Sequence, residues 1–102
     1  MKCPSYNIFF ETISSGIRMK IIELLIIKPM SVGDICNTLK EEQSKVSHNL
    51  KKLTSCNAIE VKQEGKNRIY SLNKETMVPL MKLVEKHVKT YCGGKCVKKW
   101  EI

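Results

Sequence analysis

Two apolar stripes at helical spacing lie within residues 31 to 53, and only the three polar residues 40–42 separate the two helices that they predict. The first stripe consists of Val32, Ile35, Cys36 and Leu39. The second stripe consists of Val46, Leu50 and Leu53. Because residues three or four apart share one face of a helix, each stripe predicts an amphipathic helix with one buried side. So short a connection forces the two helices into a tight turn, and Ser31 can cap the first of them.

The second helix carries polar side chains opposite its apolar stripe, and each of them can hydrogen-bond to base edges or phosphates. They are Gln43, Ser44, Lys45, Ser47, His48, Lys51 and Lys52. We expect the first five to contact bases or nearby phosphates, and Lys51 and Lys52 to contact phosphates. An ordinary surface helix is also polar outside, so this face alone does not decide between the two interpretations.

A β-hairpin pattern follows the second helix. Strand-forming residues at 59–61 and 69–72 flank the polar segment 63–67, in which Gly65 can adopt a positive φ angle. Lys62, Lys66 and Arg68 are expected on or near this hairpin, where they could reach phosphates or an adjacent minor groove. Helix, turn, helix and basic hairpin in this order predict a mainly α winged helix-turn-helix with a β-hairpin wing, and the order favours DNA binding over a plain surface helix.

Length and composition predict one globular domain over residues 1–102, since 42% of the chain is hydrophobic. The net charge of +8 favours a polyanionic partner such as double-stranded DNA, although a membrane surface would attract it too. No apolar run approaches the ~20 residues of a membrane span. Without a signal for export, the five cysteines are expected to be thiols in a cytoplasmic protein that has no membrane partner.

Catalysis is not indicated by any motif in the sequence. It contains no phosphate-cradling glycine loop, no nucleophile with a base and an orienting group, and no carboxylate pair in a pocket-forming context. We therefore do not expect an enzyme.

The two ends of the chain predict a homodimer. An aromatic segment within residues 1–14 is expected to be helical, and a strong core helix follows over 17–27 until Lys28-Pro29 ends it. Asn73 can cap a last helix over 74–91, with 93–102 as a tail. The apolar stripe of that last helix contains Met77, Leu80, Met81, Val84, Val88 and Tyr91.

Such a stripe is wide for a surface helix, so we interpret residues 1–14 and 74–92 as dimerisation helices. A two-fold dimer would place the recognition helix of each copy, the second helix of the pair described above, roughly 34 Å from that of the other copy. Such a dimer would read an inverted repeat. The alternative is a monomer whose last helix folds back on its own core.

These segments together resemble the ArsR family of winged-helix repressors over nearly the whole chain. Residues 15–25 resemble the family's second helix, 43–53 its recognition helix, usually Gln-Ser-x-Val-Ser-x-His-Leu-x-x-Leu, and 64–72 its wing. The resemblance implies a DNA-binding repressor. Two departures are Asn49, where the family usually has His, and Asn57, which replaces a Gly. Asn57 is tolerable because Asn also enters the left-handed region.

The family's best-known metal box has two cysteines around a Val, and here Ser31-Val32-Gly33 occupies that place. That sensor site is therefore missing, and Cys36 is expected to pack in the core. Any sensing is left to the cysteines near the chain ends.

Cys3, Cys92 and Cys96 could meet and bind a thiophilic ion such as Zn(II), Cd(II) or As(III), with His87 as a fourth ligand. Alternatively, Cys92 and Cys96 could form a reversible disulfide. The third alternative is that these cysteines have no function. No cofactor is required for DNA binding under any of the three.

Two other functions fit the same sequence. The scaffold could be an interaction module whose positive face binds protein or RNA. It could also be a DNA-binding protein that responds to no ligand.

Overall fold

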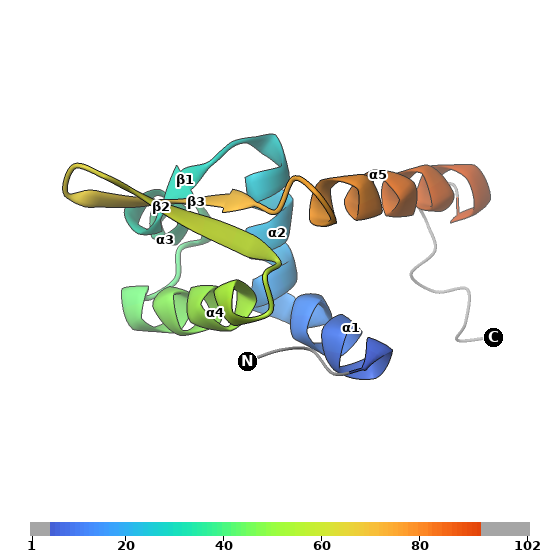
Figure 1. Cartoon of the computed structure of the whole chain (residues 1–102), viewed down its shortest axis with the longest axis horizontal. Helices are drawn as coiled ribbons and strands as arrows, with labels where there is room; N and C mark the ends of the chain where they lie inside the picture. Colours follow the sequence, from blue (N-terminus) through green and yellow to red (C-terminus); the bar gives the residue numbers. More distant parts are fainter. Residues whose placement is uncertain (1–4, 93–102) are drawn as a thin grey trace.

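The computed structural model describes residues 5–92 of the chain. Its helices are α1 (Tyr6–Ser14), α2 (Gly16–Ile27), α3 (Val32–Leu39), α4 (Gln43–Ser55) and α5 (Met77–His87). Its strands are β1 (Met30–Ser31), β2 (Ile59–Glu64) and β3 (Asn67–Leu72), and a π-helical turn, Val88–Cys92, follows α5. Figure 1 shows the β2–β3 hairpin at one end of the molecule and α5 at the other. The predicted mainly α fold with a hairpin wing is confirmed.

One hydrophobic core joins the helices to the sheet. Its buried side chains are Ile13, Ile21, Ile22, Leu25, Met30, Ile35, Val46, Leu50, Leu53, Ala58, Ile59, Leu72 and Met77. Helix α2 supplies three of them and ends before Pro29, as the sequence predicts. Burial of each large apolar side chain contributes about 1.5–3 kcal/mol, so the core positions α3 and α4 against α2.

The helix-turn-helix forms as predicted. The Ser31 hydroxyl caps α3 by accepting a hydrogen bond from the Asp34 backbone N–H at 3.2 Å. Lys40 ends α3 in the left-handed conformation, with φ of 56°, and this reverses the chain within three residues. Helix α4 then presents the predicted stripe of Val46, Leu50 and Leu53 to the core.

Helix α4 ends in a Schellman motif, which directs the chain into the wing. The backbone N–H of Asn57 donates to Thr54 O and that of Ala58 donates to Leu53 O, both at 3.0 Å. Asn57 itself has φ of 61°, so this Asn does take the left-handed conformation that Gly would favour. The motif places Ala58 and Ile59 in the core directly after the helix.

The sheet differs from the predicted two-stranded wing in two respects. The short strand β1 adds to β3, with Met30 opposite Tyr70, so the strand order is β1-β3-β2. The hairpin turn is also shorter than the predicted loop 63–67, because Glu64 pairs with Asn67 and only Gly65 and Lys66 remain between the strands. Gly65 has φ of 61°, which suits the first position of a type II′ turn.

The last helix is shorter than predicted. The Asn73 carboxamide oxygen accepts hydrogen bonds from the backbone N–H groups of Glu75 and Thr76, and this local turn holds residues 74–76 outside the helix. Helix α5 begins at Met77 and gives way to the π-helical turn after His87. After the buried Met77, the half-buried Val78, Leu80 and Met81 still pack against the core, and the rest of α5 extends away from it (Figure 1). Among residues 5–92, no helix combines the length and apolar character needed to span a bilayer.

Two isoleucines of α2 test how the core stabilises the fold. Ile22→Ala should lower the free energy of unfolding by about 2–5 kcal/mol, because Ile22 is wholly buried. Ile27→Ala on the same helix should change it by less than about 0.5 kcal/mol, because Ile27 is 77% exposed. Urea denaturation followed by circular dichroism measures both, and equal losses would contradict this description of the core.

Candidate nucleic-acid interface

The polar face of α4 is turned to solvent. All seven residues predicted for contact with DNA on this helix are exposed. At about 100° per residue, Ser44, His48, Lys51 and Ser55 follow the centre of the outer face. Ser47 and Thr54 lie along one edge, while Lys45 and Lys52 lie along the other. The buried stripe of α4 therefore leaves one continuous polar surface outside.

A groove of about 510 Å³ runs between α4 and the wing. It is lined by Ser47, Lys51, Thr54, Ser55, Val61, Arg68 and Tyr70. Val61 lies opposite Tyr70 and Gln63 opposite Arg68 in the hairpin, so Arg68 is on the face of the wing that is turned toward α4. The structure thus places Lys51 of the recognition helix and Arg68 of the wing along the same groove.

Lys62 does not share this groove. It lies opposite Ile69, on the alternate face of the hairpin, and lines a separate hollow of about 330 Å³ with Glu60 and Glu64. Lys66 is in the exposed turn at the wing tip. Of the three basic residues predicted on the wing, Arg68 adjoins the recognition helix, Lys66 is at the tip, and Lys62 is on the face with two carboxylates.

The charges on the α4 side are mostly uncompensated. Within residues 5–92, Lys45 is the one basic residue of α4 or the wing that has a carboxylate partner, Glu41, with Nζ and Oε1 3.3 Å apart. Lys51, Lys52 and Arg68 have no carboxylate within ion-pair distance in the same part of the chain. These cations can therefore bind phosphate without first breaking an ion pair.

Sequence reasoning missed a polar contact beneath this surface. Asn49 is buried, and its Oδ1 accepts a hydrogen bond from Arg18 Nη1 at 3.0 Å while its Nδ2 donates to Lys45 O at 2.8 Å. Arg18 Nε donates to Thr12 O, so one guanidinium joins α1, α2 and α4. The signal was an amide among the apolar residues of the α4 stripe, because a buried polar group needs a partner.

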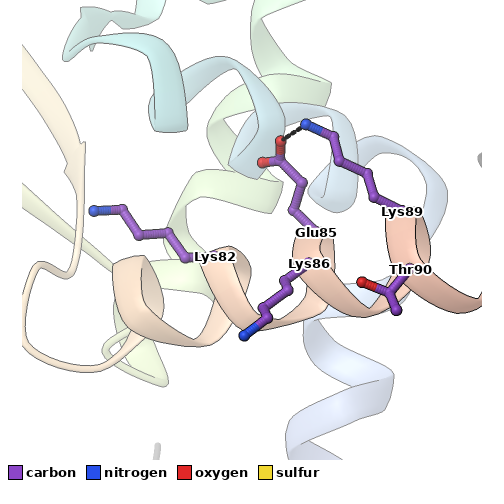
Figure 2. A pocket seen from close by; sticks show the side chains of 5 residues that line it. All are labelled: Lys82, Glu85, Lys86, Lys89 and Thr90. Atoms are coloured by element: carbon purple, nitrogen blue, oxygen red, sulfur yellow. Dashed lines mark ion pairs between the residues drawn. The ribbon is translucent and has the colours of Figure 1, made fainter.

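A second basic cluster lies on α5 and the turn after it, and Figure 2 shows that one helical segment carries all of its side chains. Glu85 forms an exposed ion pair with Lys89, with Oε1 and Nζ 2.8 Å apart. The Lys89 hydrogen bond holds the pKa of Glu85 below its ordinary value and the pKa of Lys89 above it. Lys82, Lys86 and Thr90 complete a shallow hollow to which no other element contributes, so this surface is a solvated helix face.

The residues predicted for metal or redox chemistry are only partly placed. The His87 ring lies against Tyr91, with ring centroids 4.9 Å apart, and Cys92 is half-buried at the end of the π-helical turn. Cys3 and Cys96 lie outside the described residues. Within residues 5–92, no three side chains of His, Cys, Asp or Glu gather to hold a metal ion. Cys36 packs against the core, as predicted.

Comparison with known proteins gives a family match over residues 15–61 and a shared fold. A family described as bacterial regulatory protein, arsR family, matches residues 15–61. A search of curated proteins found no match.

Solved structures share the fold over most of the chain. HlyU from Vibrio cholerae N16961 is 21% identical, with 82% of this chain and 88% of that chain covered and a TM-score of 0.70. Rv0081 from M. tuberculosis is 24% identical, with 87% and 90% covered and a TM-score of 0.76. The homodimeric winged helix-turn-helix DNA-binding domain of Mb0332 from Mycobacterium bovis is 24% identical, with 82% and 78% covered and a TM-score of 0.76. These likenesses show a winged helix-turn-helix fold.

The two faces of the wing predict different effects of two similar substitutions. Arg68→Gln should weaken binding to random-sequence duplex DNA about tenfold, because it removes one charge-assisted contact of about 1.5 kcal/mol beside α4. Lys62→Gln should weaken it less than about twofold, because Glu60 and Glu64 already reduce the positive potential on that face. Fluorescence anisotropy at low salt measures both. A larger loss for Lys62→Gln would mean that the opposite face of the wing meets the DNA.

Proposed function

We propose that this chain, whose residues 15–61 match the arsR family of bacterial regulatory proteins, is a repressor that binds an inverted repeat of duplex DNA as a homodimer. The family match and the winged helix-turn-helix support a regulator with a DNA-binding fold. We propose in addition the homodimer, the operator symmetry, the sign of regulation and the signal to which the protein responds.

The observation that carries the proposal is the exposed face of α4 beside the wing groove. A major groove about 12 Å wide admits one α-helix. With α4 in that groove, Ser44, Ser47 and His48 would face base edges, while Lys51 and Arg68 would meet the backbone on the wing side. The uncompensated charge of these cations supports contact with phosphate.

The homodimer is supported by apolar side chains that α1 and α5 expose. Phe10 on α1 and Val84 on α5 are about half exposed, and Tyr6, Leu83 and Tyr91 are more exposed still. The molecule is elongated, with extents of 49 × 31 × 21 Å, and α5 extends away from the end that carries the wing (Figure 1). A second copy that covers α1 and α5 would leave both recognition helices open to DNA. The homodimeric state of the Mb0332 domain supports a homodimer for this chain as well.

We propose that the signal that controls DNA binding acts on the thiols near the chain ends. These are Cys3, Cys92 and Cys96, with His87 as an added metal ligand. The chemistry of these residue types supports it: thiolates bind Zn(II), Cd(II) or As(III), and paired thiols oxidise reversibly. A change at the end of α5 would act on the proposed dimer contact, and through it on the spacing of the recognition helices.

Selection of bound duplexes from a random pool tests the proposal. We expect recovery of one inverted repeat, with affinity that falls steeply as salt rises. Parallel selections with Zn(II), Cd(II), As(III) or peroxide should recover less DNA, and Cys92→Ser should remove the response to the active agent. Failure to retain any duplex at low salt would favour a module that binds protein or RNA. Unchanged recovery with all four agents would contradict the thiol input alone.

A substitution on α5 tests the dimer. Val84→Glu should convert a dimer into the 11.7 kDa monomer, because it places a charge in the apolar contact. Thr90→Glu makes the same change of charge on the basic side of this segment and should remain dimeric. Sedimentation equilibrium measures both masses. A wild-type protein that is monomeric at tens of micromolar would contradict the proposed dimer.

A further inference from the structure

We propose that the pocket between α1, α2 and α4 binds a phosphate of the DNA backbone, with Arg18 and Lys52 as its cationic ligands. The pocket is lined by Thr12, Arg18, Lys52 and Ser55 and has a volume of about 270 Å³. This inference rests on the proposed DNA binding and adds a site on the other side of Ser55, which lines both this pocket and the wing groove.

The residues that line the pocket favour a negatively charged ligand. Two of its four lining residues are cations, none is a carboxylate, and neither cation has a carboxylate within ion-pair distance among residues 5–92. The hydroxyls of Thr12 and Ser55 already donate to Ile8 O and Lys51 O, so the attraction comes from Arg18 and Lys52. The volume is below the ~300–1,000 Å³ of sites for drug-sized ligands and suits a small group such as a phosphodiester.

Arg18 is held in place before any ligand arrives. Its Nε donates to Thr12 O and its Nη1 donates to Asn49 Oδ1, which fixes the plane of the guanidinium. Nη2 makes no hydrogen bond within the described part of the chain, and its two N–H groups can serve a phosphate oxygen. Since the side chain is already ordered, binding costs less conformational entropy than at a mobile surface lysine.

The pocket lies where the second of the two DNA backbones that border a major groove is expected. Helix α4 would have one DNA strand on each side. Lys51 and Arg68 line the wing side, whereas Lys52 and Arg18 line the pocket at the junction of α1 and α2 (Figure 1). With Arg68 on the wing side of the recognition helix and Arg18 and Lys52 on its other side, cations would contact the two backbones and fix how deeply the helix enters the groove.

The site is tested by replacing its charged side chains, and the DNA phosphate that they would bind, with uncharged groups. The probe is a duplex from the selection above, and its affinity for wild type, Lys52→Gln and Arg18→Gln is measured by anisotropy across a range of salt. Lys52→Gln should lower the slope of log affinity against log salt by about 0.9 per pocket, hence about 1.8 per dimer. Lys28→Gln is the matched control, because Lys28 is an exposed lysine at the opposite end of α2 from Arg18.

A duplex with a single uncharged methylphosphonate in each half-site identifies the phosphate. At one position the replacement should weaken wild-type binding at least as much as Lys52→Gln does, and should weaken the Lys52→Gln variant less than the wild type, because only Arg18 then remains to lose its partner. Arg18→Gln should show the same lack of additivity. If that variant does not fold, the Nε–H resonance of Arg18 in the wild-type spectrum should shift with natural duplex and not with the modified one.

The outcomes separate this site from the proposed function. If the wild type binds no duplex, the proposed DNA binding itself fails, and if Lys51→Gln leaves affinity unchanged, the proposed contact beside the wing groove fails. If Lys51→Gln weakens binding while Lys52→Gln matches Lys28→Gln in slope, the phosphate pocket is overturned alone. Additive losses at every methylphosphonate position would overturn it too.

Discussion

The packing of α4 against the core is the constraint on which the rest of the structure depends. Val46, Leu50 and Leu53 are almost fully buried, and the burial of each contributes about 1.5–3 kcal/mol. A rotation of the helix by one residue would expose this stripe and bury charged side chains, at a large cost in free energy. The hydrogen bond from Arg18 to Asn49 fixes the same helix from beneath. The outward face, with Ser44, His48 and Lys51, is therefore set by what is buried behind it.

The fold separates two surfaces of different chemistry. The α4 and wing surface is polar, carries uncompensated positive charge and is hollowed into a groove. The exposed side chains of α1 and α5 include large apolar groups, such as Phe10 and Val84, at the end of the molecule away from the wing. Binding to phosphate requires a positively charged surface, and self-association requires an apolar one. A chain of 102 residues can therefore provide both surfaces without a second domain.

Periodicity in the sequence was enough to predict the helix pair, the buried stripe of α4 and the hairpin, because each depends on neighbours within about one turn or one strand. It was not enough for contacts that span the chain. Strand β1 has two residues and no pattern of its own, and Arg18 meets Asn49 across 31 positions. Lys62 and Arg68 could be assigned to opposite faces only after the two-residue turn had fixed the register.

In the proposed complex, DNA meets the outer face of α4 while α5 takes no part in the contact. A titration of the isotope-labelled protein with a short duplex, followed by backbone amide resonances, tests this most directly. We expect shifts at residues 43–55 of α4 and 65–68 of the wing, with little change at Lys82, Lys86 and Lys89. Shifts concentrated along α5, with those of α4 unchanged, would contradict it.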